Sequence, residues 1–292
     1  PEKPYEVVIF TDEEGSRFNG GLTGSEAMVG DTDMEKTLKR RDYDDRLFGE
    51  VIQDVGLTVE GYSAAGRDLS EIETFVEVHI EQGKKLEKAE LPTGIVTGIA
   101  GPYWLKVVFT GLAGHAGNTP MDDRKDALVA ASAFIQRVST LPRTINETAV
   151  ATVGNLQVKP NGTNVIPGEV ILFVDIRDIA FDSRTELVNK IIETGQDIQR
   201  QTGVTFAHQC VHDVPPVPIA KERQALLAES ARRSGIKPYY LPSGAGHDAM
   251  IVGRHVPSAM LFVQSKKGIS HNPEEWSELS DCVQTIHVLK DY

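Results

Sequence analysis

The pattern of apolar and polar positions divides the chain into three blocks. In the first block, apolar runs at residues 6–10 and 74–83 predict strands, and the Gly-rich and charged segments between them predict a loop and helices. Strands that alternate with helices favour a mainly parallel sheet. We therefore predict that residues 1–97 form the first part of an α/β domain.

The second block, residues 98–213, has a different pattern. Alternating residues at 103–111 predict a half-buried antiparallel strand, and Leu128, Ala131, Ile135 and Val138 share one helical face. The predicted order is strand, helix, strand, strand, helix, strand, over residues 103–111, 126–138, 149–158, 169–178, 184–203 and 204–214. This is the ferredoxin-like βαββαβ order. We predict a compact α+β domain inserted into the α/β domain.

The third block, residues 214–292, returns to the first pattern. It contains a predicted helix at 223–235, a strand at 257–263 and a closing helix at 278–292. The predicted architecture is an α/β domain with a mainly parallel sheet, interrupted by the α+β domain. The first predicted strand begins only a few residues after Pro1. We therefore expect a segment upstream of Pro1 to belong to the fold.

Composition and charge narrow the classes of function. The 292 residues contain 30 Lys plus Arg against 42 Asp plus Glu, and a formal charge of -12 makes nucleic acid an unsuitable partner. There is no apolar run of about 18 residues and no signal-peptide pattern, so we expect a cytoplasmic protein without a membrane partner. Two scattered cysteines, Cys210 and Cys282, leave any metal site to His and carboxylate ligands.

Three consecutive carboxylates, Asp12, Glu13 and Glu14, end the first apolar run and precede Gly15. A solvated acidic turn is the simpler interpretation. The alternative is a catalytic carboxylate beside a metal-binding one, because ligands of open parallel sheets gather beyond the carboxyl ends of the strands. Two adjacent Glu can serve one site only where the strand has ended and the backbone turns, and Gly15 permits that turn.

Further candidates follow other predicted strands. In FVEVHIEQG the period of two places Glu77, His79 and Glu81 on one face, which indicates either a wet strand face or a metal-binding His held by neighbouring acceptors. His115 lies in a Gly-rich loop and His271 in a loop after a strand, where solvated side chains are the simpler interpretation.

The remaining polar candidates suit an anionic ligand. Asn164 is expected in a turn, and Arg177 ends an apolar strand, where it can bind a carboxylate or form a surface ion pair. The sequence from Gly244 to Ala249 has the form G-x-G-x-x-A but lacks a flanking βαβ unit and a later acidic residue, so we exclude dinucleotide binding. Gly244 and Gly246 can still present backbone amides to an anion.

Six stretches taken together resemble one family. FTDEEGSRF, HIEQG, GHAGNTPM, PNGTNVIPG with DIR, SGAGHDA and GISHNPEEW occur in the order found in the amidohydrolase branch of the M20 dinuclear metallohydrolases. Within that branch the chain is similar to the N-carbamoyl-L-amino-acid hydrolases and the allantoate amidohydrolases, from about residue 5 to the C-terminus. The resemblance implies that the inserted domain is a lid and dimerisation domain.

The resemblance also implies roles for individual residues. Glu13 matches the general base, and His115 matches the histidine that polarises the scissile carbonyl. Glu14, His79 and His271 match ligands of two divalent ions, which are Zn, Mn, Co or Ni in such sites. The positions that match substrate contacts are Gln82, Asn164, Arg177 and Gly246, with Asn164 and Arg177 on the amino-acid carboxylate.

The implied reaction removes the carbamoyl group of an N-carbamoyl-L-amino acid in a homodimer. Allantoate hydrolysis and an M20 aminoacylase or peptidase are the alternatives that share these ligands. Two upstream motifs of the family, a His-x-Asp and a Gly-rich segment with a bridging aspartate, have no counterpart in this sequence. We therefore expect the isolated chain to hold metal poorly and to have little activity. It is either part of an enzyme whose N-terminal segment lies elsewhere, or an inactive dimerising fragment or binding module.

Overall fold

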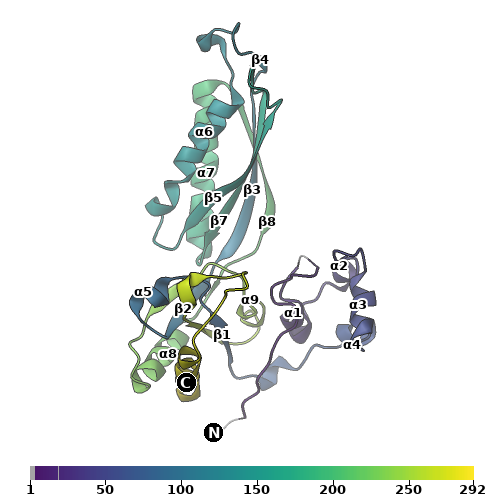
Figure 1. The fold of residues 1–292 in the computed structure, drawn as a ribbon, viewed down its shortest axis with the longest axis vertical. Coiled ribbons are helices and arrows are strands. Elements are labelled where there is room, and N and C mark those ends of the chain that lie inside the picture. The colour runs from purple at the N-terminus through teal and green to yellow at the C-terminus, as the bar shows by residue number, and fades with distance from the viewer. Residues whose placement is uncertain (1–3, 19) are drawn as a thin grey trace. The chain divides into compact units, whose positions relative to one another are not determined.

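The computed structural model describes residues 4–18 and 20–292 (Figure 1). Residues 1–3, at the start of the first predicted block, and Asn19, in its predicted loop, lie outside the described residues. The chain divides into two compact units. Unit 1 comprises residues 1–97, 219–241 and 245–292, and unit 2 comprises residues 98–218 and 242–244.

Unit 1 is a mixed sheet with helices. Its strands are β1 (Phe75–Ile80), β2 (Thr93–Ile99), β10 (Tyr240–Ser243) and β11 (Ser258–Val263), in the order β1-β11-β2-β10, and β9 (Val217–Pro218) pairs with β2. The helices of this part of the chain are α1 (Thr23–Val29), α2 (Met34–Leu38), α3 (Phe48–Asp54), α4 (Val59–Ser63), α5 (Lys85–Ala89), α8 (Lys221–Arg233), α9 (Ala249–Val252) and α10 (Leu279–Asp291), with 3-10 turns η1 (Leu69–Glu71) and η4 (Lys266–Gly268).

The predicted α/β class is confirmed, but the sheet is mixed. β1 and β11 are parallel, but β11 and β2 are antiparallel, and so are β2 and β9. A parallel return needs a crossover that carries the chain back to the starting end of the sheet. The connection from β1 to β2 contains only the short helix α5, so the chain enters β2 from the end where β1 finished.

The apolar run at residues 6–10 is not a strand. The structure assigns these residues no secondary structure, and Val7 and Ile9 are 90% and 92% exposed. A strand needs hydrogen bonds to a neighbour, and the part of the chain that the structure describes supplies no strand pairing for this segment. Apolar character alone was therefore an insufficient signal.

Unit 2 is a four-stranded antiparallel sheet with two long helices. Its main elements are β3 (Gly101–Thr110), α6 (Ala127–Val138), β5 (Val150–Lys159), β7 (Glu169–Asp178), α7 (Phe181–Thr202) and β8 (Thr205–Asp213). The sheet order β5-β7-β3-β8 and the antiparallel pairings give the ferredoxin-like arrangement. A small ladder of β4 (Gly114–His115) and β6 (Val165–Ile166), and 3-10 turns η2 (Met121–Asp123) and η3 (Leu141–Thr144), complete it.

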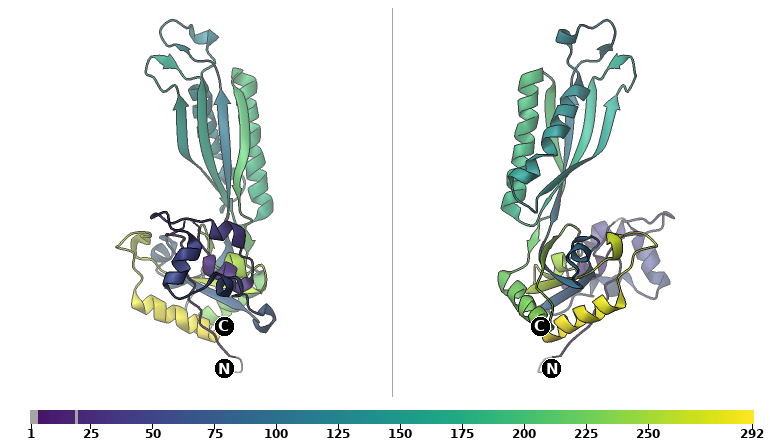
Figure 2. Two further views of the ribbon diagram at one scale, coloured as in Figure 1. Left: turned by 90° about the vertical axis from the view of Figure 1, so that its right-hand side faces the viewer. Right: turned by 60° about the vertical axis from the view of Figure 1, so that its left-hand side comes forward.

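Both helices of unit 2 cover the same face of its sheet, as the two views in Figure 2 show. Inward residues of the strands, such as Leu105, Val107 and Leu172, pack with Phe134 of α6 and Ile191 of α7 in one buried cluster. The opposite sheet face lacks such a cover within the described part of this unit, and it carries Trp104, Asp175 and Arg177. Among the described residues, no helix is long and apolar enough to cross a membrane.

Candidate active site

A tight turn in unit 1 presents the adjacent carboxylates Glu13 and Glu14. The Leu22 N–H donates to the Glu13 carbonyl at 3.1 Å, and the Thr23 hydroxyl donates to the Asp12 carboxylate at 2.7 Å. One backbone bond and one side-chain bond thus fix this turn. Gly15 has φ 64°, and a Cβ there would lie 2.4 Å from the backbone nitrogen of Gly21. The turn therefore requires glycine at position 15.

Glu13 lies between two histidines that come from distant parts of the chain. Its carboxylate oxygens are 3.9 Å from His79 Nε2 and 4.0 Å from His247 Nδ1. The two imidazole rings meet edge to face, with centroids 4.5 Å apart. Ligand atoms of all three residues lie within 4.8 Å of one another, which is the only such group of three or more found among the described residues. His79 is supplied by β1, and His247 by the loop after β10.

The backbone sets the tautomer of His79. Its Nδ1 lies 2.8 Å from the Ile80 carbonyl, which can only accept, so Nδ1 carries a proton and the neutral ring has its lone pair on Nε2. Burial alone would lower the pKa of His79, but the Glu13 carboxylate and the Ile80 carbonyl outweigh it and raise that pKa to about 9. The charges that attract a proton to this nitrogen would equally attract a metal cation.

No catalytic or metal-binding role was predicted for three buried residues here, His247 of this group and Glu77 and Asp248 beside it. Burial, followed by the positive charge of His79, lowers the pKa of His247 to about 3. Burial raises the pKa of Glu77 to about 7, although the Ala249 N–H donates to its Oε2 at 2.7 Å. Burial also raises the pKa of Asp248 to about 6. The only sequence signal for His247 and Asp248 was the His-Asp pair within SGAGHDA.

One interpretation of the sequence placed the polar face of β1 in solvent, but the exposure of its side chains is the opposite at two neighbouring positions. Glu77 is buried and Val78 is 39% exposed, so the polar residue faces inward and the apolar residue outward. Glu81 does not face a ligand: its carboxylate accepts the backbone N–H groups of Lys85 and Leu86 and so caps α5. The acceptor that orients His79 is the Ile80 carbonyl, not a neighbouring carboxylate.

Glu14, His271 and Gln82 form a second, more exposed group. His271 Nε2 is 3.3 Å from Glu14 Oε2, and Gln82 Nε2 is 3.3 Å from Glu14 Oε1 and 3.4 Å from His271 Nε2. Gln82 and His271 both have φ 55°, a left-handed conformation that non-glycine residues adopt at a cost. The fold thus brings together three of the predicted site residues and holds two of them in strained backbone.

Two predicted residues meet at the β4–β6 ladder of unit 2. His115 pairs with Val165, and the Asn164 carbonyl accepts from the Ala116 N–H at 3.0 Å. The Gly117 N–H donates to His115 Nδ1 at 3.0 Å, so the neutral ring carries its proton on Nε2. His115 is exposed, and Nε2–H is available as a hydrogen-bond donor to a ligand.

Arg177 lies at the other end of unit 2. The β4–β6 ladder lies beyond the Glu169 end of β7, as Figure 1 shows, whereas Arg177 is next to the last residue of that strand. Eight residue steps along a strand span about 26 Å. Asn164 and Arg177 of one chain are therefore too far apart to hold the same carboxylate, and the prediction that both contact it stays a prediction.

Gly246, the last of the predicted site residues, lies in the Gly-rich loop after β10. Gly244 and Gly246 are exposed, while His247 and Asp248 that follow are buried. A Cβ at Gly246 would meet only the Met250 sulfur, at 3.7 Å, and a Cβ at Gly244 would meet nothing within 4 Å. Neither glycine is required by local crowding, and both leave the backbone open to a ligand.

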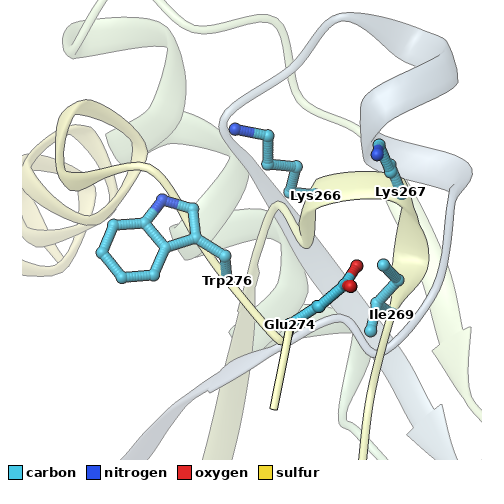
Figure 3. Close-up of a pocket in the computed structure, with 5 residues that line it drawn as sticks. All are labelled: Lys266, Lys267, Ile269, Glu274 and Trp276. Atoms are coloured by element: carbon cyan, nitrogen blue, oxygen red, sulfur yellow. The ribbon is translucent and has the colours of Figure 1, made fainter. Parts of the chain in front are cut away.

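A separate pocket lies in the loop around η4 and contains none of the predicted site residues. Its volume is about 270 Å³, and it is lined by Lys266, Lys267, Ile269, Glu274 and Trp276. Figure 3 shows Glu274 beside Ile269, below the turn that carries both lysines, with the Trp276 ring directed to the other side. Lys266 is engaged by Glu278 at 3.0 Å, so this shallow surface pocket presents no convergent set of catalytic groups.

The donor atoms of unit 1 suit divalent metal ions. Carboxylate oxygen and imidazole nitrogen are the ligands that Zn, Mn, Co and Ni accept. The lone pair of His79 Nε2 is directed by the bond that its other nitrogen makes to a carbonyl, as is usual for metal-binding histidines. Glu13 and His247 beside it, and the Glu14–His271 pair, provide further oxygen and nitrogen donors. The residues present fit the metal that the sequence predicted.

Comparison with known families matches residues 1–292 to Peptidase family M20/M25/M40. The chain belongs to this family. It is similar to an N-carbamoyl-L-amino acid amidohydrolase of Geobacillus stearothermophilus, with 39% identity over 98% of the chain and 69% of that protein. It is also similar to an allantoate amidohydrolase of Bacillus subtilis, with 33% identity over 100% of the chain and 70% of that protein.

Solved structures agree with this family. A hydantoinase/carbamoylase family amidase from Burkholderia multivorans superposes with a TM-score of 0.85 and 34% identity, over 96% of this M20 chain and 67% of that one. The resemblance expected from the six motifs is thus confirmed. The family and the relatives identify this M20 protein as a metal-dependent amidohydrolase with a mixed α/β fold.

Proposed function

We propose that the protein hydrolyses the ureido C–N bond of N-carbamoyl-L-amino acids. With one water, the reaction gives the L-amino acid, ammonia and carbon dioxide. The observation that carries this proposal is the Glu13 carboxylate held beside His79 and His247, next to the Glu14–His271 pair, in an M20 chain. The substrate class comes from the Geobacillus stearothermophilus relative, which is named for N-carbamoyl-L-amino acids.

Two divalent ions are proposed as cofactors, with His79, Glu14 and His271 as protein ligands. When bound, such ions lower the pKa of a water molecule and polarise the carbonyl group of the substrate. The 3.3 Å contact between Glu14 and His271 supports a shared ion at that pair. The bond from His79 Nδ1 to the Ile80 carbonyl supports Nε2 as the other nitrogen ligand.

Glu13 is proposed as the general base and then the general acid. Its carboxylate would accept a proton from the attacking water and return it to the leaving nitrogen, because a ureido nitrogen leaves poorly as an anion. The side chain of Glu13 is 20% exposed, which allows contact with a substrate while limiting competition from bulk water. His247, kept neutral by burial, would support the position of Glu13 without neutralising it.

His115 and Arg177 of unit 2 are proposed to make the main contacts with the rest of the substrate, and residues of both units the further ones. His115 would donate its Nε2–H to the carbonyl oxygen as negative charge develops there, a role worth about 2.7–4 kcal/mol for comparable donors. Arg177 would bind the amino-acid carboxylate, with Asn164, Gln82 and Gly246 as further contacts.

The positions of these residues support a homodimer, which we propose as the active form. Arg177 and Asn164 lie at opposite ends of β7 in one chain, about 26 Å apart along the strand. We propose that His115 and Asn164 reach the site of a second copy, and that residues 98–213 form the lid and dimerisation domain between the two catalytic segments, 1–97 and 214–292. A C2 pair would then complete two equivalent sites.

Allantoate is the second candidate substrate. The Bacillus subtilis relative is named for it, and allantoate presents both a ureido group and a carboxylate to the same residues. An M20 aminoacylase or peptidase activity ranks third. A binding module without catalysis is disfavoured, because the chain retains Glu13 at the position of the base.

Parallel rate measurements test the proposal. We would compare kcat/KM of the metal-loaded full-length protein, called the parent below, on N-carbamoyl-L-methionine, allantoate and N-acetyl-L-methionine, with ammonia release as the signal for the first two. The proposal expects the highest value for N-carbamoyl-L-methionine. A higher value for allantoate would replace the proposed substrate, and turnover of N-acetyl-L-methionine alone would identify an aminoacylase.

A further inference from the structure

Three hydrogen bonds within unit 2 hold the guanidinium of Arg177. Its Nε and Nη2 donate to the two carboxylate oxygens of Asp175, both at 2.8 Å, and its Nη1 donates to the Gly244 carbonyl at 2.8 Å. A guanidinium has five N–H donors, so two remain, one on each terminal nitrogen. Such a pair matches the two oxygens of a carboxylate.

Asp175 is itself held from a neighbouring strand. Asp175 and Arg177 are two positions apart on β7 and therefore share one face of the sheet. Trp104 of β3 lies directly opposite Asp175, and its indole N–H donates to Asp175 Oδ2 at 3.2 Å. The Trp104 ring packs in turn against His212, with centroids 4.6 Å apart. The carboxylate of Asp175 is thus held from two sides, by Arg177 and by Trp104.

We propose that Asp175 is a positioning residue for the carboxylate-binding site, holding Arg177 so that its two remaining N–H donors are preorganised for the substrate carboxylate. Trp104 fixes Asp175 in turn. This inference rests on the proposed function, in which Arg177 binds the amino-acid carboxylate. The named residues belong to unit 2, so the arrangement does not depend on how the two units are placed.

Asp175 has two opposing effects on the binding of a substrate carboxylate by Arg177. Its negative charge repels a second carboxylate, but that charge is already engaged by Arg177 and by the Trp104 indole. The pair is about two-thirds buried, with side chains 30% and 33% exposed, and hydrogen bonding to Asp175 raises the pKa of Arg177, which keeps the guanidinium charged. Without Asp175, the long side chain would have to be ordered on each binding event. Preorganisation therefore outweighs repulsion.

The test compares two substrates that differ only in the carboxylate. We would measure kcat and KM of the metal-loaded parent and Asp175→Asn proteins on N-carbamoyl-L-methionine and on 3-(methylthio)propylurea, the same molecule without its carboxylate. Asn keeps the shape but turns an N–H donor toward the guanidinium, so one arm of the bidentate contact is lost. We expect KM for N-carbamoyl-L-methionine to rise about tenfold, with little change in kcat or in kcat/KM for the urea.

Control variants show whether a change in Asp175→Asn comes from the contact between Asp175 and Arg177. Glu169→Gln makes the same acid-to-amide change at the other end of β7, where the partner is Lys159, and should leave the preference for the carboxylated substrate unchanged. Trp104→Phe should lower that preference less than Asp175→Asn does. Arg177→Met should abolish it. An unchanged or increased preference in Asp175→Asn, while Arg177→Met abolishes it, would overturn the positioning role alone.

The failure of the underlying proposal has a different signature. If Arg177→Met leaves the preference for the carboxylated substrate intact, Arg177 does not bind the carboxylate, and the inference about Asp175 falls with it. If the parent protein turns over neither compound but hydrolyses allantoate, the proposed substrate is wrong irrespective of Asp175.

Discussion

At the residue scale, the position of Glu13 between His79 and His247 leaves two roles to separate, general base and metal ligand. Glu13→Gln keeps an oxygen that can contact a cation but cannot accept a proton. If Glu13 is the base, the variant should keep the metal content of the parent and lose about 10²- to 10⁴-fold in kcat. Metal analysis by mass spectrometry and ammonia release measure the two properties on one preparation.

Loss of one metal equivalent in Glu13→Gln would contradict the assignment and make Glu13 a ligand, which its distances to His79 and His247 also allow. Glu6→Gln is a suitable control. Glu6 is an exposed glutamate of the same unit, paired with Arg67 at 2.7 Å, and its substitution should change neither metal content nor rate.

A second prediction at the residue scale concerns Asp178 and the pH dependence of the free energy of unfolding. It is fully buried, and burial would raise its pKa, but hydrogen bonds from Ser183, Thr148, Asn146 and the Ile179 N–H outweigh this and hold the pKa below its usual value. A carboxylate with a lowered pKa stabilises the fold above its unfolded-state pKa, and this contribution is lost as the pH falls through the folded-state value.

Asp178→Asn should therefore lower the free energy of unfolding at pH 7 by about 1–3 kcal/mol. The difference from the parent should shrink as the pH falls below the unfolded-state pKa of aspartate, about 3.9, because the parent then loses the charge as well. Urea unfolding followed by circular dichroism at several pH values measures it. A difference that is constant with pH would rule out the charge as its origin, and Asp197→Asn, at an exposed ion pair with Arg200, is the matched control.

At the element scale, unit 2 was the part best predicted from sequence. Its strands and helices lie within a few residues of the expected ranges, because ten-residue alternation and a long amphipathic helix leave little ambiguity. Local polar groups set the limits of helices that the apolar pattern alone does not fix. The Asp42 carboxylate accepts the N–H groups of Asp44 and Arg46 in the turn between α2 and α3, and the Asp126 carboxylate caps α6.

Gly195 gives a prediction about the packing of α7 on its sheet. A glycine inside a helix usually costs stability, so alanine should gain about 1 kcal/mol from helix propensity. At this position, however, a Cβ would lie 2.1 Å from Cε2 of Phe206 on β8. Overpacking of this kind costs about 1–3 kcal/mol. We expect Gly195→Ala to lower the midpoint of urea unfolding.

The control for this prediction is Gly49 of α3, where a Cβ would be 3.4 Å from its nearest side-chain atoms, an ordinary contact. Gly49→Ala should be neutral or stabilising. A stabilised Gly195→Ala protein would show that the Phe206 ring moves aside at little cost. Combining Gly195→Ala with Phe206→Leu should recover part of the loss, because the smaller side chain makes room for the methyl group.

At the scale of the whole molecule, the sequence indicates which residues belong to the site better than it indicates which of them meet in space. Glu13, Glu14, His79 and His271 were predicted from strand ends and motifs, and the structure brings them into two adjacent groups. The contact of Glu77 with the Ala249 N–H joins positions 172 residues apart, and no local pattern encodes it. The burial of His247 likewise depends on packing among distant segments.

The separation of Arg177 from Asn164 leads to the last prediction, which concerns assembly. If His115 acts in the site of a second copy, Glu13→Gln and His115→Ala proteins are each inactive, but a mixed dimer contains one site with both residues intact. Random association of equal amounts makes half of the dimers mixed, so activity should recover to about a quarter of the parent value. If both residues act within one chain, no mixed dimer has an intact site and activity stays at background. Co-expression with two affinity tags isolates the mixed dimer alone, in which one of two sites is intact, so its rate should be about half of the parent value. A background rate would place both residues in the site of one chain, and recovery of a doubly tagged species also shows whether a stable dimer forms.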